Sequence, residues 1–263
     1  MPEPLQYLLG LGSGVLVGFT LGLVGGGGSI LATPLMIYVV GVADAHVAIG
    51  TSAVAVAVNA LIGLMNHARA RTVKWRCGII YGVAGMTGAF LGSTLGKAID
   101  GTWLLALFAL LMMLVGVVMI CRRGDPGVEG AQCNRQNLPA LLRYAVGSGG
   151  LSGFFGIGGG FLIVPGLIAA TRMPMANAVG TSLIAISAFG LTTAANYARA
   201  GLIDWPLVGL FVAGGLIGSL TGVAVLRRTA IAGGRLNLIF AAFVMTVGAC
   251  IFFNSMTALR PHA

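Results

Sequence analysis

Gly22-Leu-Val-Gly-Gly-Gly-Gly-Ser-Ile-Leu-Ala-Thr-Pro34 is a glycine-rich stretch that returns 131 residues later as Gly153-Phe-Phe-Gly-Ile-Gly-Gly-Gly-Phe-Leu-Ile-Val-Pro165. Consecutive glycines are poor helix formers, each costing roughly 1 kcal/mol relative to alanine. In an apolar chain, backbone that is not helical must be shielded by protein or must line a polar cavity. The two stretches are therefore the leading candidates for a substrate site between broken membrane helices, with simple hinges or tight helix crossings as the alternative.

The composition indicates the environment of the chain. Hydrophobic residues make up 57% of the 263 residues and charged residues only 8%, with a mean hydropathy of +0.99. Apolar stretches of about 20 residues recur without the alternating polarity of a membrane β-barrel. We therefore predict an all-α polytopic membrane protein. The net charge of +9 would suggest nucleic acid as the partner of a soluble protein. Here the basic residues fall in short connections, so we expect the lipid bilayer as a partner and not nucleic acid.

An internal duplication extends well beyond the glycine stretches. Small and polar residues match at an offset of 130, whereas matches between Leu and Val would mean little in such a chain. We interpret the chain as two repeats, residues 5–121 and 141–254, joined by a polar linker of residues 122–140. The matched residues include Gly50-Thr51-Ser52 with Gly180-Thr181-Ser182, Asn66 with Asn196, Arg69 with Arg199, and Trp75 with Trp205.

Each repeat contains five apolar segments, of which the second is too short to span a membrane. A segment of 14 residues such as 29–42 rises only about 21 Å, against a hydrocarbon core of about 30 Å. We therefore pair the first two segments as a helical hairpin that is broken at the glycines and is followed by three transmembrane helices. Each repeat then crosses the membrane an odd number of times, which gives two inverted-topology repeats. The segments are 5–24, 29–42, 47–66, 77–97 and 102–121, then 141–157, 160–171, 177–197, 206–226 and 235–254.

The basic residues favour this inverted arrangement over parallel repeats. It places 12 of the 15 Lys and Arg residues on one side of the membrane, leaving Lys97, Arg199 and Arg260 on the other, whereas parallel repeats divide them 10 to 5. The side rich in Lys and Arg is cytoplasmic in membrane proteins. We therefore expect the linker in the cytoplasm and both termini on the periplasmic or extracellular side of a multi-pass protein.

The glycine stretches predict a site for an anion. A helix that starts just after each stretch, near Ser29 and Phe161, would direct unpaired N–H groups and the positive end of its dipole into the protein. No Lys or Arg lies in the middle of a predicted span, and the acidic residues lie in or beside connections, so a carboxylate site for a buried cation is not expected. The expected backbone donors are Gly25, Gly26, Gly27, Gly28, Ser29, Gly156, Gly158, Gly159 and Gly160.

Hydroxyl and amide side chains are expected to complete this site. As alternatives, hydroxyl groups in membrane helices often bond only to their own backbone, and asparagines near span ends could be helix caps. His46 and His67 lie at predicted interfaces, where we expect them to be solvated. His46 is also a candidate proton carrier, because histidine titrates near neutral pH. The candidate binding side chains are Thr51, Ser52, Asn59, Asn66, Thr181, Ser182 and Asn196.

The cysteines show none of the close spacings of a metal site. We expect Cys77, Cys121, Cys133 and Cys250 to be free thiols, with a redox or substrate-handling role for Cys133 as the alternative.

Three ladders place a glycine at every fourth residue, a spacing that lets membrane helices approach closely. We expect packing contacts there, either within one chain or between copies, so that a homo-oligomer is one option. The ladders are Gly10, Gly14, Gly18 and Gly22; Gly88, Gly92 and Gly96; and Gly214, Gly218 and Gly222.

Taken together, these motifs resemble the sulfite exporter TauE/SafE family, also called the 4-toluene sulfonate uptake permease family. The resemblance rests on the glycine-rich loops before Pro34 and Pro165, on Gly-Thr-Ser at 50–52 and 180–182, and on Asn-x-x-Arg at 66–69 and 196–199. It covers residues 8–254 and implies a bacterial inner-membrane carrier of sulfur-containing anions such as sulfite, sulfoacetate or other organosulfonates. The repeats are chemically unequal, since Ile157 interrupts the second glycine run and His46 corresponds to Ala176.

The sequence therefore predicts a secondary transporter of a small sulfur-containing oxyanion or organosulfonate, working by alternating access around a site near the midplane. We expect an exporter, although the sequence does not specify the direction of transport. The chain lacks the GxxxxGK[ST] motif of an ATP-binding loop, so a gradient or another subunit must supply energy. Proton coupling is one option, and no cofactor, metal or enzymatic activity is expected. The alternatives are a carrier of a carboxylate or a metal ion, a membrane-embedded enzyme, and a scaffold without transport.

Overall fold

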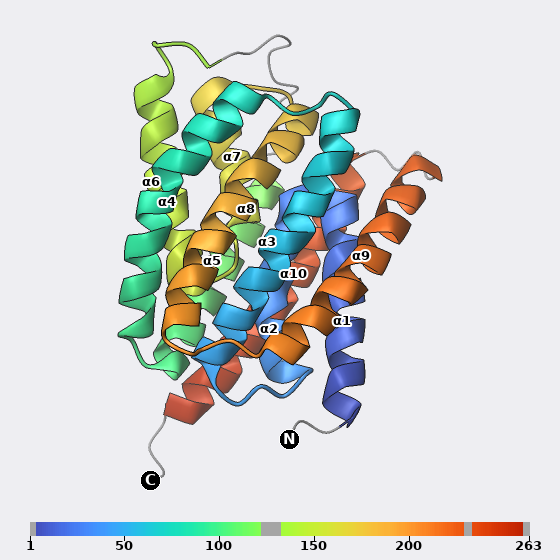
Figure 1. Ribbon diagram of the computed structural model, residues 1–263, viewed down its shortest axis with the longest axis vertical. Helices are drawn as coiled ribbons and strands as arrows, with labels where there is room; N and C mark the ends of the chain where they lie inside the picture. The colour runs from blue at the N-terminus through green and yellow to red at the C-terminus, as the bar shows by residue number, and fades with distance from the viewer. Residues whose placement is uncertain (1–3, 122–132, 229–232, 260–263) are drawn as a thin grey trace.

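The computed structural model describes residues 4–121, 133–228 and 233–259, and within these ranges every regular element is a helix. The all-α prediction is confirmed. The first half contains α1 (Pro4–Val24), the 3-10 helix η1 (Gly25–Leu31), α2 (Ala32–Tyr38), α3 (Ala45–Arg69), α4 (Trp75–Lys97) and α5 (Gly101–Cys121). The second half contains α6 (Leu138–Phe155), α7 (Gly160–Thr171), α8 (Met175–Arg199), α9 (Trp205–Arg228) and α10 (Gly233–Leu259) (Figure 1).

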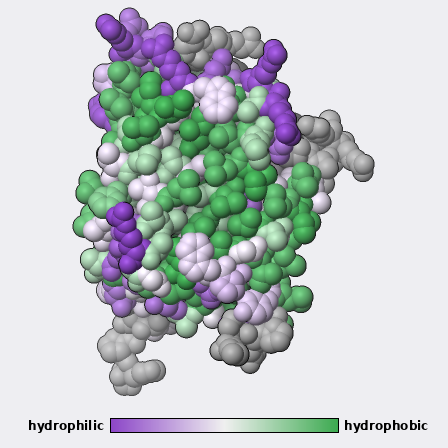
Figure 2. Space-filling model, viewed as in Figure 1, coloured by the Kyte–Doolittle hydropathy of each residue, from purple (hydrophilic) through white to green (hydrophobic). Residues whose placement is uncertain are grey.

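The surface of the bundle suits a membrane. Six of the described helices, α1, α3, α4, α5, α8 and α9, are long and apolar enough to cross a bilayer. Large apolar side chains such as Leu95, Leu114 and Leu220 point outward, as expected where lipid rather than water surrounds the helices. Figure 2 shows a broad hydrophobic band across the middle of the molecule, with hydrophilic residues gathered toward its ends. The prediction of a multi-pass membrane protein is therefore confirmed.

The first broken segment turns back along α1. A Cβ atom added at Gly28 would lie 2.6 Å from Oγ1 of Thr20, so η1 folds against the last turns of α1. Gly41, which follows α2, lies near the start of α1, with 3.9 Å between its added Cβ and Nε2 of Gln6. The chain thus returns to the end of the bundle at which α1 begins.

The second broken segment has the same form. A Cβ atom added at Gly159, just before α7, would lie 2.6 Å from Cβ of Ser152, and one at Gly166 would lie 3.6 Å from Cβ of Tyr144. The contacts move toward the start of α6 as α7 proceeds, so α6 and α7 are antiparallel neighbours. Because α7 also packs against η1, the two hairpins meet inside the bundle.

Close approaches between helices fix their relative directions. Gly63 lies beside Leu183, whereas Gly190 lies beside Ala57, so α3 and α8 are antiparallel. The approaches between α5 and α10 give the same result for that pair. Helices α3 and α8, and likewise α5 and α10, occupy equivalent places in the two halves of the sequence. These equivalent helices therefore run in opposite directions.

The glycine ladders hold the two halves together. A Cβ atom added at Gly14 would lie 2.9 Å from Cα of Phe211, and one added at Gly92 would lie 2.9 Å from N of Phe154. Side chains at these positions would collide with the backbone of a neighbouring helix. Helix α1 thus packs closely on α9 and α4 on α6, which confirms the predicted packing role of the ladders within a single chain.

The two ends of the bundle differ in charge. We call the end at which α1 begins and α10 ends, and which carries Lys97 and Arg199, the termini end (Figure 1). The opposite end, where α5 ends and α6 begins, is the linker end. The linker end carries the described basic residues Arg69, Arg71, Lys74, Arg76, Arg135, Arg143 and Arg172.

Candidate functional site

The second hairpin is broken by three glycines in the left-handed conformation. Helix α6 ends at Phe155 and is capped by Gly156, with φ of 65°, and Gly158 and Gly159 follow with φ of 64° and 67°. Residues with a Cβ atom rarely adopt this conformation. The predicted interruption of the helix at this glycine run is therefore present, and Gly160 is the first residue of α7.

This break lies beside the middle of the two most buried spanning helices. A Cβ atom added at Gly158 would lie 2.8 Å from Cγ1 of Val56 and 3.4 Å from Cγ2 of Ile186. Val56 and Ile186 are close to the centres of α3 and α8, respectively. The break is therefore shielded by protein near half depth, as non-helical backbone in a membrane must be.

The start of α7 leaves main-chain donors at the break. The carbonyl oxygen of Gly159 accepts from the N–H groups of Leu162 and Ile163, at 2.9 Å each. The first N–H groups of a helix have no intrahelical acceptor, so those of Gly160 and Phe161 are available to a ligand. The predicted helix start near Phe161 is confirmed.

Ser152 faces this break from α6. Its side chain is fully buried, its Oγ has no hydrogen-bond partner, and a Cβ atom at Gly159 would lie 2.7 Å from that Oγ. Sequence reasoning missed Ser152, because the equivalent residue of the first repeat is Leu21 and the duplication therefore gave no signal.

The first hairpin is built differently. Residues Gly25–Leu31 form a 3-10 helix that continues from α1, and α2 starts only at Ala32. The predicted helix start near Ser29 is therefore wrong, because the glycine run tightens into a 3-10 helix instead of ending in a loop. Ser29 is fully buried within η1. For Gly25, Gly26 and Gly27 only the course of the backbone within η1 is described, so their predicted role as donors stays a prediction.

A buried hydrogen bond fixes the first hairpin to α3. Oγ1 of Thr33, in α2, lies 2.9 Å from Oγ of Ser52, which also donates to the carbonyl oxygen of Ile49 at 3.0 Å. The equivalent pair in the second repeat is Val164 and Ser182, and Ser182 donates only to its own helix, at Val179 O. The two Gly-Thr-Ser motifs thus differ at the serine.

The threonines of these motifs bind the connections between helices. Thr51 Oγ1 accepts from the N–H group of Asp204, just before α9, at 3.0 Å, and Thr181 Oγ1 accepts from that of Lys74, just before α4, also at 3.0 Å. Gly50 provides room for the first of these connections, since an added Cβ would collide with Leu202 O. Both threonine hydroxyls therefore join the two halves of the chain.

The three candidate asparagines lie far apart along the bundle. Asn66 is exposed near the linker end, and Asn196 is buried near the termini end, where its Nδ2 donates to Ser93 Oγ at 2.7 Å and to Thr94 Oγ1 at 3.0 Å. Asn59 lies in the interior of α3, is only 7% exposed, and has no partner for either atom of its amide. The structure does not bring Asn66 and Asn196 to one site.

Unpaired polar side chains also occur on α3 and α8, the two helices beside the second break. Asn59 lies one turn from Val56 along α3, and Thr193 lies two turns from Ile186 on the same face of α8. Both Val56 and Ile186 contact the position of Gly158. Leaving such groups unpaired in a low-dielectric interior is costly. Asn59 points toward α9, since a Cβ atom added at Gly215 would meet its amide, so among the unpaired described groups only Ser152 is shown at the break itself. Among the described residues, the side chains with unpaired buried atoms are Ser13, His46, Asn59, Ser152, Thr193 and Tyr197.

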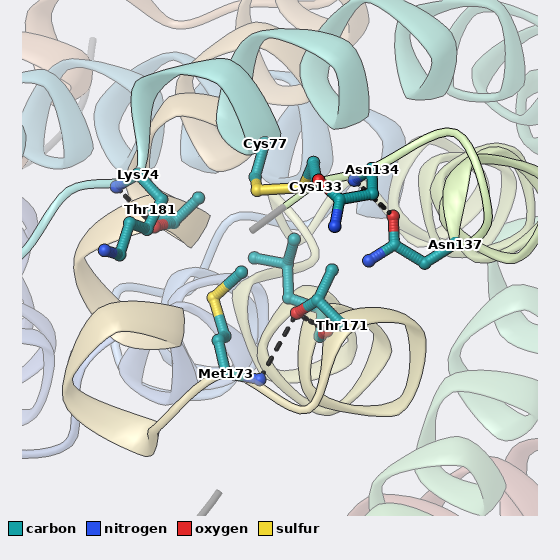
Figure 3. Close-up of a disulfide and its surroundings, with 9 residues drawn as sticks. Lys74, Cys77, Cys133, Asn134, Asn137, Thr171, Met173 and Thr181 are labelled. Carbon is teal, nitrogen blue, oxygen red and sulfur yellow. Dashed lines mark hydrogen bonds between the residues drawn. A yellow bond between two sulfur atoms is a disulfide. The ribbon is translucent and has the colours of Figure 1, made fainter. Parts of the chain in front are cut away.

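The expectation that all cysteines are free thiols is wrong for two of them. Cys77, at the start of α4, and Cys133, just before α6, form a disulfide with a Cα–Cα separation of 5.5 Å (Figure 3). The two residues are distant in sequence, and only the packing of α4 on α6 brings them together. Cys250 is free and exposed. The close-up also shows Lys74 bonded to Thr181 near the disulfide.

Two further features of the described residues bear on the kind of site. No cluster of three His, Cys, Asp or Glu side chains suited to a metal occurs among them.

A pocket between α2 and α10 is lined mainly by apolar residues, including Leu31, Pro34 and Phe243. It offers few groups to an anion and lies away from the break before α7.

Known proteins are similar in sequence to this chain over most of its length. The family model described as "Sulfite exporter TauE/SafE" matches residues 10–251. A "Probable membrane transporter protein" of Xylella fastidiosa (strain Temecula1) is 49% identical over 255 residues, which are 97% of this chain and 98% of that protein. The "Probable membrane transporter protein YdhB" of Bacillus subtilis (strain 168) is 28% identical over 212 residues, 79% of this chain and 85% of the relative. No solved structure matches the chain.

Proposed function

Since the chain belongs to the sulfite exporter TauE/SafE family, we propose that this membrane transporter is a secondary carrier of a small sulfur-containing oxyanion or organosulfonate, such as sulfite or sulfoacetate. The observation that carries this proposal is the break before α7. It combines main-chain N–H groups at a helix N-terminus with the unpaired hydroxyl of Ser152, near the middle of the bundle. Such donors suit an anion without requiring a buried Lys or Arg.

The substrate-binding residues in this proposal are Gly158, Gly159, Gly160 and Ser152. Each either lies at the break or carries a buried polar group without a partner. An oxyanion has several acceptor oxygens and can pair with N–H, hydroxyl and amide donors at once. The same geometry would also suit a carboxylate, which the transport assay below distinguishes.

Alternating access is supported by the directions of the helices. Equivalent helices of the two halves are antiparallel, and the broken hairpins of both halves meet inside the bundle. Carriers built from inverted repeats place their substrate at such a meeting point and expose it alternately by moving one part against the other. We propose that residues 5–121 and 141–254 are two such repeats.

The proposed orientation places the linker end in the cytoplasm and both termini outside it, in a bacterial inner membrane. The excess of Arg and Lys at the linker end supports this orientation. The Cys77–Cys133 disulfide lies at the same end, although cytoplasmic thiols are usually kept reduced. The orientation is proposed from the basic residues because many of them share one end, whereas the disulfide is a single bond.

Transport by the purified protein in proteoliposomes tests this function. Labelled sulfite, sulfoacetate, sulfate and acetate are offered in turn, with and without a pH gradient. We expect movement of sulfite or sulfoacetate well above that in protein-free vesicles, and stimulation by the pH gradient if protons are coupled. Acetate transport without movement of any sulfur-containing anion would contradict the proposed substrate class. The absence of any anion movement would contradict the function.

A further inference from the structure

A second polar cluster lies at the termini end, outside the break before α7. It comprises Lys97 at the end of α4, Tyr197 near the end of α8, and His46 in the first turn of α3. The Tyr197 ring joins the other two, since its centroid is 5.8 Å from Lys97 Nζ and 6.4 Å from that of the His46 ring. Three helices that are distant in sequence thus bring these side chains together.

Lys97 carries a charge that no described carboxylate balances. Its Nζ donates to the main-chain oxygen of Asn196 at 3.1 Å and to its Oδ1 at 2.8 Å, both of which are neutral acceptors. No ion pair joins Lys97 to an acidic residue in the part of the chain that the structure describes. An ammonium has three donors, so one of them is available to a further acceptor.

Tyr197 and His46 each contribute a buried group that lacks a partner. The hydroxyl of Tyr197 belongs to a fully buried side chain and has no hydrogen-bond partner, although tyrosine hydroxyls usually find one when buried. Nδ1 of the half-buried His46 is likewise unpaired. The expectation that His46 is solvated is therefore wrong at this atom, because packing against α8 shields it.

The nearby carboxylates already have backbone partners. Asp44 caps α3, with its Oδ1 accepting from the N–H group of His46 at 2.7 Å, and Asp204 Oδ1 accepts from that of Leu207 at 3.1 Å, in the first turn of α9. The other charged groups at this end are Asp100, whose Oδ1 accepts from the N–H group of Thr102 at 2.9 Å, and Arg199, which is exposed. None of these groups pairs with the Tyr197 hydroxyl or with Nδ1 of His46.

We propose that Lys97, Tyr197 and His46 form a second binding site for a small oxyanion, at the termini end of the transport path. The Lys97 ammonium, the Tyr197 hydroxyl and a protonated Nδ1 of His46 would donate to its oxygens. The cluster is connected to the break before α7, since His46 lies one turn before Ile49, whose side chain meets the position of an added Cβ at Gly156. This inference rests on the proposed function only for its place on a transport path.

Calorimetric titration of the full-length protein with sulfite, with chloride for comparison, tests the site. We expect Lys97→Gln to weaken sulfite binding about tenfold, which corresponds to about 1.4 kcal/mol, and Tyr197→Phe to weaken it about threefold. Lys97→Arg should retain binding because it keeps the charge. Arg199→Gln is the matched control, since Arg199 carries an equal but exposed charge at the same end of the bundle as Lys97. This variant should leave the sulfite affinity unchanged.

The same titrations in a Gly159→Val background separate this site from the one at the break. There we expect a single remaining sulfite site whose affinity still depends on Lys97. A structural role for Lys97, as a cap of α8, would lower the Tm of Lys97→Gln without changing the sulfite Kd. That result, or an equal loss of affinity in Arg199→Gln, overturns the inference even if the wild-type protein transports anions. Binding that depends on Lys97 in a protein without transport would support this site while contradicting the proposed function.

Discussion

The two hairpins share a glycine-rich sequence, but the backbone at this sequence differs between them. In the first, the run Gly25–Leu31 remains hydrogen-bonded as a 3-10 helix, and Thr33 binds Ser52 of α3. In the second, glycines adopt the left-handed conformation and open a break beside the unpaired hydroxyl of Ser152. The same glycine-rich sequence is thus compatible with two backbone conformations, a 3-10 helix and a left-handed break. The surrounding residues determine which of the two forms.

Ile157 is one residue that makes this difference. It interrupts the second glycine run, and its side chain is fully buried in the core. Its N–H group donates to the carbonyl oxygen of Ser152 at 3.3 Å, which completes the end of α6. The corresponding residue of the first repeat, Gly26, has no side chain to anchor a loop in this way. This difference supports the proposal that the second hairpin binds the ligand and that the first anchors the bundle.

Among the variants that test the difference between the hairpins, Gly159→Val should have the largest effect, a loss of transport. Its φ of 67° is unsuited to a β-branched residue, and the new side chain would displace Ser152. We expect transport in proteoliposomes to be abolished while membrane insertion is retained. Gly147→Val, in the same hairpin, is the control, since nothing lies within 4 Å of an added Cβ there. Normal transport by Gly159→Val would exclude the break as the substrate site.

Ser152→Ala should have an intermediate effect that is confined to transport. Removing a buried hydroxyl without a partner should not reduce stability, but a hydrogen bond to an anion contributes about 1.5–3 kcal/mol. We expect the KM for the transported anion to rise roughly tenfold with the Tm unchanged. Ser219→Ala removes a hydroxyl that bonds only to its own helix, at Leu216 O, and should leave the KM unchanged. An unaltered KM in Ser152→Ala would remove this residue from the site.

Thr33→Val should have the smallest effect, and on stability alone. It breaks the bond between the first hairpin and Ser52, which a buried pair makes at a net gain of about 1 kcal/mol. For a chain of this size we expect the Tm to fall by about 2–4 °C, measured by thermal unfolding in detergent. Val164→Thr makes the second hairpin resemble the first and serves as the reciprocal variant. A loss of Tm as large in Val164→Thr as in Thr33→Val would contradict the assigned difference between the hairpins.

The apolar segments of the sequence predicted the helices well, because a helix that crosses a membrane needs a long apolar stretch. The segment predicted at 102–121 differs from α5 by only one residue, and α7 has the predicted bounds of 160–171. The pattern did not predict that residues 25–31 form a 3-10 helix, because glycine runs are compatible with several backbone conformations. The candidate site was predicted where glycine marks it and missed at Ser152, since the equivalent residue of the first half, Leu21, is not polar.

The sequence by itself determined the all-helical class, the membrane environment and the position of the break before α7, since these follow from composition and spacing along the chain. Only the tertiary structure decided which polar groups have partners. Thr51 and Thr181 proved to bind distant connections, Cys77 met Cys133, and Asn59 and Ser152 were left unpaired. The physical reason is that the hydrogen-bond partners of a buried group depend on which helices are neighbours. The spacing of residues along one helix does not predict these neighbours.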